Sequence, residues 1–182
     1  MDVGPGPIVE SPAVETSPEA ARQPAWHVLW TRSNCEALVS DQLTAKGFHV
    51  FLPTLEMWVR RGAARQRHRV PMFPGYVFLQ LLQVQRQKVY QSDYVANLLD
   101  VPDQETFAQQ LGDILQALET DLEVFLAPQI TAGARVKVKS GPLRGMEGWV
   151  QERAGVTMVL LRLDFISQAA AVKIEATELE IV

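Results

Sequence analysis

The chain has 182 residues, a formal net charge of −4 and a single cysteine. This length suffices for one sizeable domain or two small ones, and one cysteine excludes an intrachain disulfide framework, which fits a reducing cytoplasm. No apolar run approaches the length of a membrane span, and the N-terminus lacks the basic and apolar segments of a secretion signal. We therefore expect a cytoplasmic protein with no membrane anchor.

Charges are segregated along the chain. Segment 60–69 holds five arginines and no acidic residue, whereas segment 100–123 holds seven acidic residues and no lysine or arginine. A basic tip on an acidic body orients a protein on a polyanion without making it bind every polyanion. Nucleic acid therefore stays open as a partner in spite of the negative net charge.

The N-terminal elements are marked by composition and spacing. Residues 1–24 hold five prolines and no periodic apolar pattern, which predicts a disordered tail. The apolar run 26–30 suits a first strand. Ser33 and Glu36 have the spacing of a capping box, which predicts a helix over about 34–46, and Gly47 stands where a helix commonly ends.

The middle of the chain predicts a hairpin and a central strand. Residues 48–52 form a short strand stopped by Pro53, and apolar and polar residues alternate over 55–60 as in a half-buried strand. Gly62-Ala63-Ala64 is the expected hairpin tip, and the returning arm leads into a strand over 71–81. Three further elements are predicted: a short helix over 83–90, a strand over 95–101, and an apolar-striped helix over 103–122.

Beyond a boundary at 128–133 the pattern changes to short strands separated by turns. Five strands are predicted, over 135–139, 146–151, 157–164, 170–174 and 179–182. The expected fold class is therefore α+β: an antiparallel sheet with packed helices, followed by a small five-stranded, SH3-like β-barrel. The β-branched valines and the turn residues there favour a permanent barrel over a helical state, in an open two-domain protein.

Chemistry-bearing constellations are not recognisable in the sequence. The three histidines are scattered singly, and there is no metal-ligand spacing, glycine-rich phosphate loop or nucleophile with a base. We expect a protein that is not an enzyme and that uses no metal and no cofactor.

Three motifs, in this order, resemble the NusG/RfaH family: Trp26-His27-Val28-Leu29-Trp30, Phe73-Pro74-Gly75-Tyr76-Val77-Phe78, and the stretch from Gly133 to Gly145. The resemblance covers roughly residues 25–182 and implies an N-terminal NGN domain and a C-terminal KOW barrel. The expected division is a tail over 1–24, an NGN domain over 25–122, a linker over 123–131 and a KOW domain over 132–182.

The resemblance also implies binding surfaces. It assigns contacts with the clamp helices of the largest subunit of RNA polymerase to Trp30, Phe73, Tyr76 and Phe78; core packing is the alternative for each. It implies contacts with non-template or upstream DNA for the arginine-rich edge: Arg32, Arg60, Arg61, Arg65, Arg67 and Arg69. Arginine suits phosphate through its planar fork of donors.

In the C-terminal part, the resemblance identifies a KOW motif at Gly133, Gly141, Pro142, Gly145 and Gly148, whose first role is conformational. Phe165 and Ile166 correspond to the loop that NusG proteins present to a small-subunit ribosomal protein. Two exposed apolar residues in a turn fit such a contact, but Ser167-Gln168 departs from the family pattern after them.

The function implied is that of a monomeric transcription elongation factor that bridges the polymerase cleft and promotes processive elongation. The proline-rich tail, the arginine hairpin and the altered loop favour a specialised antiterminator. Two alternatives stay open: a housekeeping NusG that couples polymerase to the ribosome or to a termination factor, and a ribosomal or other RNA-binding KOW protein.

Overall fold

The computed structural model describes residues 23–61, 64–127, 133–153 and 156–182. The predicted tail, except for residues 23 and 24, and the predicted hairpin tip at Gly62 and Ala63 therefore lie outside the described residues. The elements are β1 (Ala25–Thr31), α1 (Glu36–Ala45), β2 (His49–Phe51), β3 (Thr54–Arg61), β4 (Ala64–Pro71), β5 (Tyr76–Leu81), η2 (Gln83–Gln85), α2 (Arg86–Val89), β6 (Val95–Asp100), α3 (Gln104–Leu118), β7 (Val124–Ala127), β8 (Arg135–Val138), β9 (Glu147–Arg153), β10 (Val156–Leu163), η3 (Asp164–Ile166), β11 (Gln168–Lys173), η4 (Ala176–Glu178) and β12 (Leu179–Ile181). None of the helices in the described part is long and apolar enough to cross a membrane.

The N-terminal sheet is antiparallel, with strand order β2-β5-β1-β6. The predicted central strand over 71–81 is confirmed over Tyr76–Leu81 as β5, which lies inside this order, whereas Pro71 ends β4 and residues 72–75 form a turn. Val77 and Leu79 pack with the apolar side of α1, whereas Phe78 packs with Phe107 of α3 on the opposite face. Because helices cover both faces, β5 is buried almost continuously instead of in alternation.

Helix α1 begins without the predicted capping box. Cys35 is the residue before the helix, and no side chain caps it. The Glu36 carboxylate instead accepts a hydrogen bond from the Gly75 amide, 2.6 Å away. The prediction of a Ser33–Glu36 box is wrong because a partner 39 residues away takes the carboxylate. At the other end, Gly47 adopts the left-handed backbone expected of it, with φ of +82°.

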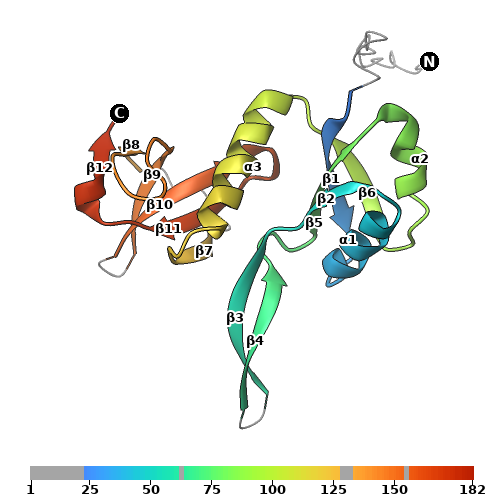
Figure 1. Ribbon diagram of the computed structural model, residues 1–182, viewed down its shortest axis with the longest axis horizontal. Coiled ribbons are helices and arrows are strands. Elements are labelled where there is room, and N and C mark those ends of the chain that lie inside the picture. Colours follow the sequence, from blue (N-terminus) through green and yellow to red (C-terminus); the bar gives the residue numbers. More distant parts are fainter. Residues whose placement is uncertain (1–22, 62–63, 128–132, 154–155) are drawn as a thin grey trace, which may run out of the picture.

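Strands β3 and β4 form a two-stranded sheet of their own, which Figure 1 shows as a ribbon that projects away from the rest of the chain. Their register places Thr54 opposite Pro71 at the base and Arg61 opposite Ala64 near the tip. The predicted hairpin is confirmed, and its two arms are free of the larger sheets.

The C-terminal sheet has the strand order β12-β8-β9-β10-β11-β7, with all pairs antiparallel. It holds six strands, one more than predicted, because β7 lies where the sequence predicts a linker. The predicted linker over 123–131 therefore needs correction at its start, because Val124 to Ala127 pair with residues 169–172 of β11. Within the described residues, the strand order has two ends, and closure into a barrel stays a prediction.

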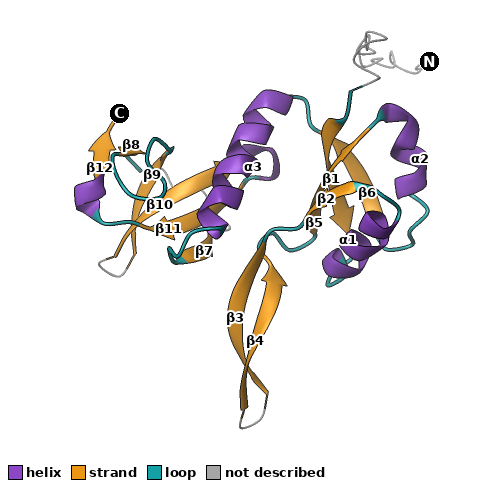
Figure 2. Ribbon diagram, in the orientation of Figure 1, coloured by secondary structure: helices purple, strands orange, loops and turns teal. Residues whose placement is uncertain are grey.

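Helix α3 lies between the two sheets (Figure 2). Its apolar stripe, Phe107, Leu111, Ile114 and Ala117, is buried in one core cluster with residues from β1, β5, β8, β10 and β11. The prediction of an open arrangement of two separate domains is therefore wrong, because α3 packs on both sheets. Residues 159–163 lie in β10, so the predicted strand there is confirmed.

Candidate functional surfaces

One row of side chains crosses the end of the N-terminal sheet. Trp30 stands opposite Tyr76 on β5 and opposite Asn97 on β6, so the three residues share a face of the sheet. Trp30 is 53% exposed, Tyr76 is half-buried and Asn97 is exposed. These three residues, which we call the Trp30 row, form a surface on which the aromatic side chains of Trp30 and Tyr76 remain accessible.

Gly75 fixes the backbone beside this row. Its φ of +86° is a left-handed conformation that favours glycine, and the Trp30 ring lies over it. The Gly75 amide donates to Glu36 Oε1, and the Gly75 carbonyl accepts from the Thr31 amide at 2.8 Å. Glu36 is 5% exposed, so its carboxylate holds the turn from inside. The sequence does not predict this role, because the capping-box spacing assigns Glu36 a local partner.

Phe73 and Phe78 do not belong to the accessible surface. They are 1% and 0% exposed, and their rings pack edge to face at 5.8 Å between centroids. Phe78 also contacts Phe107 at 5.9 Å. The resemblance assigns polymerase contacts to four residues. Phe73 and Phe78 are packed in the core, and Trp30 and Tyr76 are accessible to a partner.

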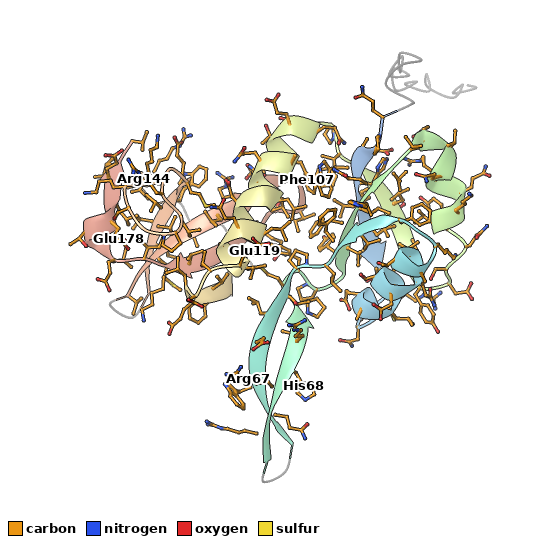
Figure 3. The ribbon with its side chains drawn as sticks, viewed as in Figure 1. Arg67, His68, Phe107, Glu119, Arg144 and Glu178 are labelled. Carbon is orange, nitrogen blue, oxygen red and sulfur yellow. The ribbon has the colours of Figure 1, made fainter. Side chains whose placement is uncertain are left out.

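The hairpin carries an aromatic and basic side. Trp58 is 61% exposed, stands opposite Arg67 in the register, and has the Arg67 guanidinium 5.0 Å from its ring centroid. Glu56, the single acidic residue of segment 54–71, lies 3.3 Å from Arg67 Nη1 and 3.8 Å from Arg69 Nε. Figure 3 shows Arg67 and His68 leaving the hairpin on opposite sides.

The predicted DNA-contacting arginines are only partly brought together. Arg65, Arg67 and Arg69 are exposed at alternate positions of β4. Arg32 is exposed too, but it follows β1 and its amide donates to the Tyr94 carbonyl, so it belongs to the sheet and not to the hairpin. Arg60 pairs with Arg65 in the register, while its side chain and that of Arg61 lie outside the described part.

A second group of arginines lies beside a cleft of about 770 Å³ between α3 and the C-terminal sheet. There Arg162 lies 4.5 Å from the Trp149 ring centroid, and 2.7 Å from Asp164. Arg135 lies 2.5 Å from Glu147. Burial raises the pKa of Asp113, which also lines this cleft. Arg135 and Arg162 each have a carboxylate partner, and Arg144, which also lines this cleft, is exposed.

The predicted KOW positions are conformationally constrained. Gly141 and Gly145 have φ of +81° and +94°. A Cβ on Gly148 would lie 2.5 Å from Val159 Cγ1 and 2.7 Å from the Leu160 carbonyl oxygen, and one on Gly133 would lie 1.8 Å from the Val150 carbonyl oxygen. The carbonyl of Pro142 accepts a hydrogen bond from Gln116 of α3.

The loop at Phe165 and Ile166 faces the protein itself. Phe165 stands edge-on to Phe107, and Ile166 is 8% exposed. Next to them, Gln110 Nε2 donates to Asp164 Oδ2 at 2.6 Å, and the Asp164 amide donates back to Gln110 Oε1 at 3.0 Å. The expectation that both apolar residues are exposed is wrong, because Ile166 is buried and Phe165 is half-buried against Phe107 of α3.

Comparison with known proteins finds a family model and solved structures that this chain resembles. A family model described as "Transcription termination factor nusG" matches residues 24–111. Thermotoga maritima NusG, in a structure titled for its domain interaction, shares the fold with a TM-score of 0.54 at 20% identity, over 89% of this chain and 99% of that one. A structure of the MjSpt4:Spt5 complex in conformation B aligns with a TM-score of 0.32 at 14% identity, over 86% of this chain and 96% of that one. No curated protein matches the sequence. The matched region holds both the Trp30 row and the Arg-rich hairpin, and residues 24–111 of this chain belong to the NusG family.

Proposed function

We propose that this chain is a transcription elongation factor of the antiterminator kind, which binds RNA polymerase through the Trp30 row. The observation that carries the proposal is the pair of aromatic side chains, Trp30 and Tyr76, side by side on an accessible sheet end. Aromatic residues on a rigid support dominate the binding energy of many interfaces. The Gly75 turn supplies that support, because Glu36 and Thr31 hold it from both sides.

The partner proposed for this row is the pair of clamp helices of the largest polymerase subunit. Helical partners bind surfaces that offer a few aromatic anchors to their apolar side. In this proposal Phe73 and Phe78 act indirectly: they fill the core beneath the turn and set the position of Tyr76. The factor would act mechanically, by holding the polymerase clamp closed, and would need no catalytic residue.

The hairpin is proposed to contact the non-template or upstream DNA. Segment 54–71 carries five arginines against one acidic residue, and Arg65, Arg67 and Arg69 are exposed. Guanidinium groups without enough internal carboxylates attract phosphate, and such binding weakens as salt rises.

The contact between α3 and the loop at Phe165 and Ile166 favours a specialised paralogue over a factor that couples polymerase to a ribosome. In the arrangement described, α3 occupies the surface to which a ribosomal protein is expected to bind. The Ser167-Gln168 sequence that follows also departs from the pattern expected of a coupling factor. A termination factor at the same loop would meet the same obstacle.

The proposed domain division keeps residues 25–122 as the polymerase-binding part and residues 132–182 as the KOW part, with a monomer acting in the cytoplasm. Helix α3 then belongs to the first part by sequence and to the core of both by contact.

The experiment is retrieval of core RNA polymerase by the tagged full chain, followed by single-round transcription on a template with a known pause. We expect retrieval of the polymerase and shorter pauses. Failure to retrieve the polymerase would refute the proposal. Deletion of the gene should alter transcription of a few operons; a global effect would instead favour the housekeeping function.

A further inference from the structure

We propose that the β3–β4 hairpin binds single-stranded DNA by stacking unpaired bases on Trp58, with the neighbouring arginines on the phosphates. The choice of DNA over RNA rests on the function proposed above. The stacking site itself is argued from the geometry of the hairpin alone.

Trp58 lies largely exposed on the hairpin. Its side chain is 61% exposed on a two-stranded ribbon, and it belongs to none of the buried core clusters among the described residues. A large aromatic surface left in water is unfavourable unless a partner covers it. Core packing therefore does not explain this residue.

Trp58 and the described arginines of β4 lie on the same side of the hairpin. Directly opposed residues of an antiparallel pair share a face, and alternate residues of a strand return to it. Trp58 is opposed to Arg67, and Arg65 and Arg69 are the alternate neighbours of Arg67. Met57 and His68, an opposed pair, lie on the other side. The hairpin thus has one aromatic and basic side and one side without arginine among these described side chains.

The exposed indole ring of Trp58 favours unpaired bases over a duplex. A base in a duplex has both faces covered by its neighbours in the stack, so only an unpaired base can stack on an indole ring. Proteins that bind single strands without sequence preference combine a basic track for the backbone with aromatic platforms for the bases. The Arg67 guanidinium, 5.0 Å from the Trp58 ring centroid, adds a second planar group to that platform.

Glu56 is the hairpin's own acidic residue on this side, and Glu119, Asp121 and Glu123 line the same cleft as Glu56, Trp58 and Arg69. Glu56 lies within 4 Å of both Arg67 and Arg69, and all three side chains are exposed. Pairs of this kind contribute little stability in water, so a phosphate can displace the carboxylate from either guanidinium. Glu56 then acts as an internal competitor of the DNA backbone, and its neutralisation should strengthen binding.

The test is a titration of the full chain with a labelled oligothymidine of about 12 nucleotides, within the site sizes known for single-strand binders, at several salt concentrations. Trp58→Ala should weaken binding about tenfold and leave the slope of log affinity against log salt unchanged, whereas Trp58→Phe should keep most of the affinity. Changing both Arg65 and Arg67 to Gln should flatten that slope by about 1.4, since each phosphate contact on a single strand contributes about 0.7. Glu56→Gln should tighten binding.

The matched control is Met57→Ala, which removes an adjacent, 51% exposed side chain from the other side of the ribbon and should leave binding unchanged. Three results would overturn the proposal: unchanged affinity of Trp58→Ala, a duplex of the same length bound as tightly as the single strand, or tighter binding of the corresponding RNA. Retrieval of core polymerase by Trp58→Ala should equal that of the wild type, so failure of the polymerase proposal and failure of the stacking proposal give different results.

Discussion

The rings of Phe107 and Phe165 stand edge to face, with 6.0 Å between their centroids and 89° between their planes. Phe107 also contacts Trp26 at 5.8 Å and Phe78 at 5.9 Å. A single side chain of α3 therefore joins the aromatic core of the N-terminal sheet to the loop after β10. The two sheets are connected by packing and not only by the chain.

The number of ring contacts predicts how much each phenylalanine stabilises the fold. Each aromatic pair contributes about 1 kcal/mol beyond the buried area. Phe107→Leu loses three such contacts and should lower the free energy of unfolding roughly three times as much as Phe165→Leu, which loses one. Urea unfolding with linear extrapolation measures both. Equal losses would show that Phe107 does not connect the two sheets energetically.

The buried carboxylate of Glu36 should stabilise the Gly75 turn. Glu36→Ala leaves the Gly75 amide without its acceptor and should cost about 1–3 kcal/mol of unfolding free energy. Glu36→Gln keeps an acceptor oxygen in the same place and should cost clearly less. The measurement is the urea midpoint of the three proteins; a glutamine variant as unstable as the alanine variant would mean that the hydrogen bond is not the source of the stability.

The elements with a local pattern could be predicted from the sequence, whereas the long-range contacts of Glu36 and Phe107 could not. The strand β1 and the helices α1 and α3 follow from local periodicity, with errors of one to four residues at their ends, whereas β5 begins five residues after the predicted start because residues 72–75 form a turn. The Glu36–Gly75 bond and the Phe107–Phe165 contact join residues 39 and 58 positions apart in the chain, and no local pattern encodes such a pairing.

The errors in the C-terminal part and in the hairpin have similar causes. β7 is only four residues long, and its partner is an alanine run that forms a strand edge more than 40 residues later. Trp58 is not among the predicted site residues, although it stands opposite Arg67 once Arg61 pairs with Ala64. A tip extended to Ala64 leaves that register undetermined, and one position of slip moves Trp58 to the other face.

Gly148 should tolerate no side chain. Its missing Cβ would meet Val159 Cγ1 at 2.5 Å and the Leu160 backbone at 2.7 Å, and backbone cannot move aside as a flexible side chain can. Gly148→Ala should therefore destabilise the chain by about 1–3 kcal/mol. The control is Gly112→Ala in α3, where the space around the Cβ is open; it should stabilise the chain by about 0.5–1 kcal/mol through helix propensity. Thermal unfolding of both variants gives the comparison, and a Gly148→Ala protein as stable as the wild type would contradict it.

His27 should make stability depend on pH. It is 5% exposed, with Nδ1 2.8 Å from the Ala25 carbonyl oxygen and Nε2 3.2 Å from Asp100 Oδ1. Burial is the main cause that lowers its pKa below 6.5. The unfolded chain then binds a proton that the folded chain does not, so the free energy of unfolding should fall as the pH drops below 6.5 and level off once the folded state is protonated too.

The variant that checks this is His27→Gln, which cannot titrate. Urea midpoints at pH 7.5 and pH 5.5 should differ less for the variant than for the wild type. Wild-type stability that rises on acidification across this interval would mean that the acceptors around His27 outweigh its burial.

Binding of core RNA polymerase by a Trp30→Ala, Tyr76→Ala double variant tests the proposed function most directly. Because both side chains lie on the surface beside a turn held by other groups, the variant should keep the wild-type circular-dichroism spectrum while its binding weakens by about 2–4 kcal/mol. Phe125→Ala, which removes an exposed aromatic side chain from β7, should bind like the wild type. A folded double variant with undiminished affinity for the polymerase would contradict the assignment of this surface.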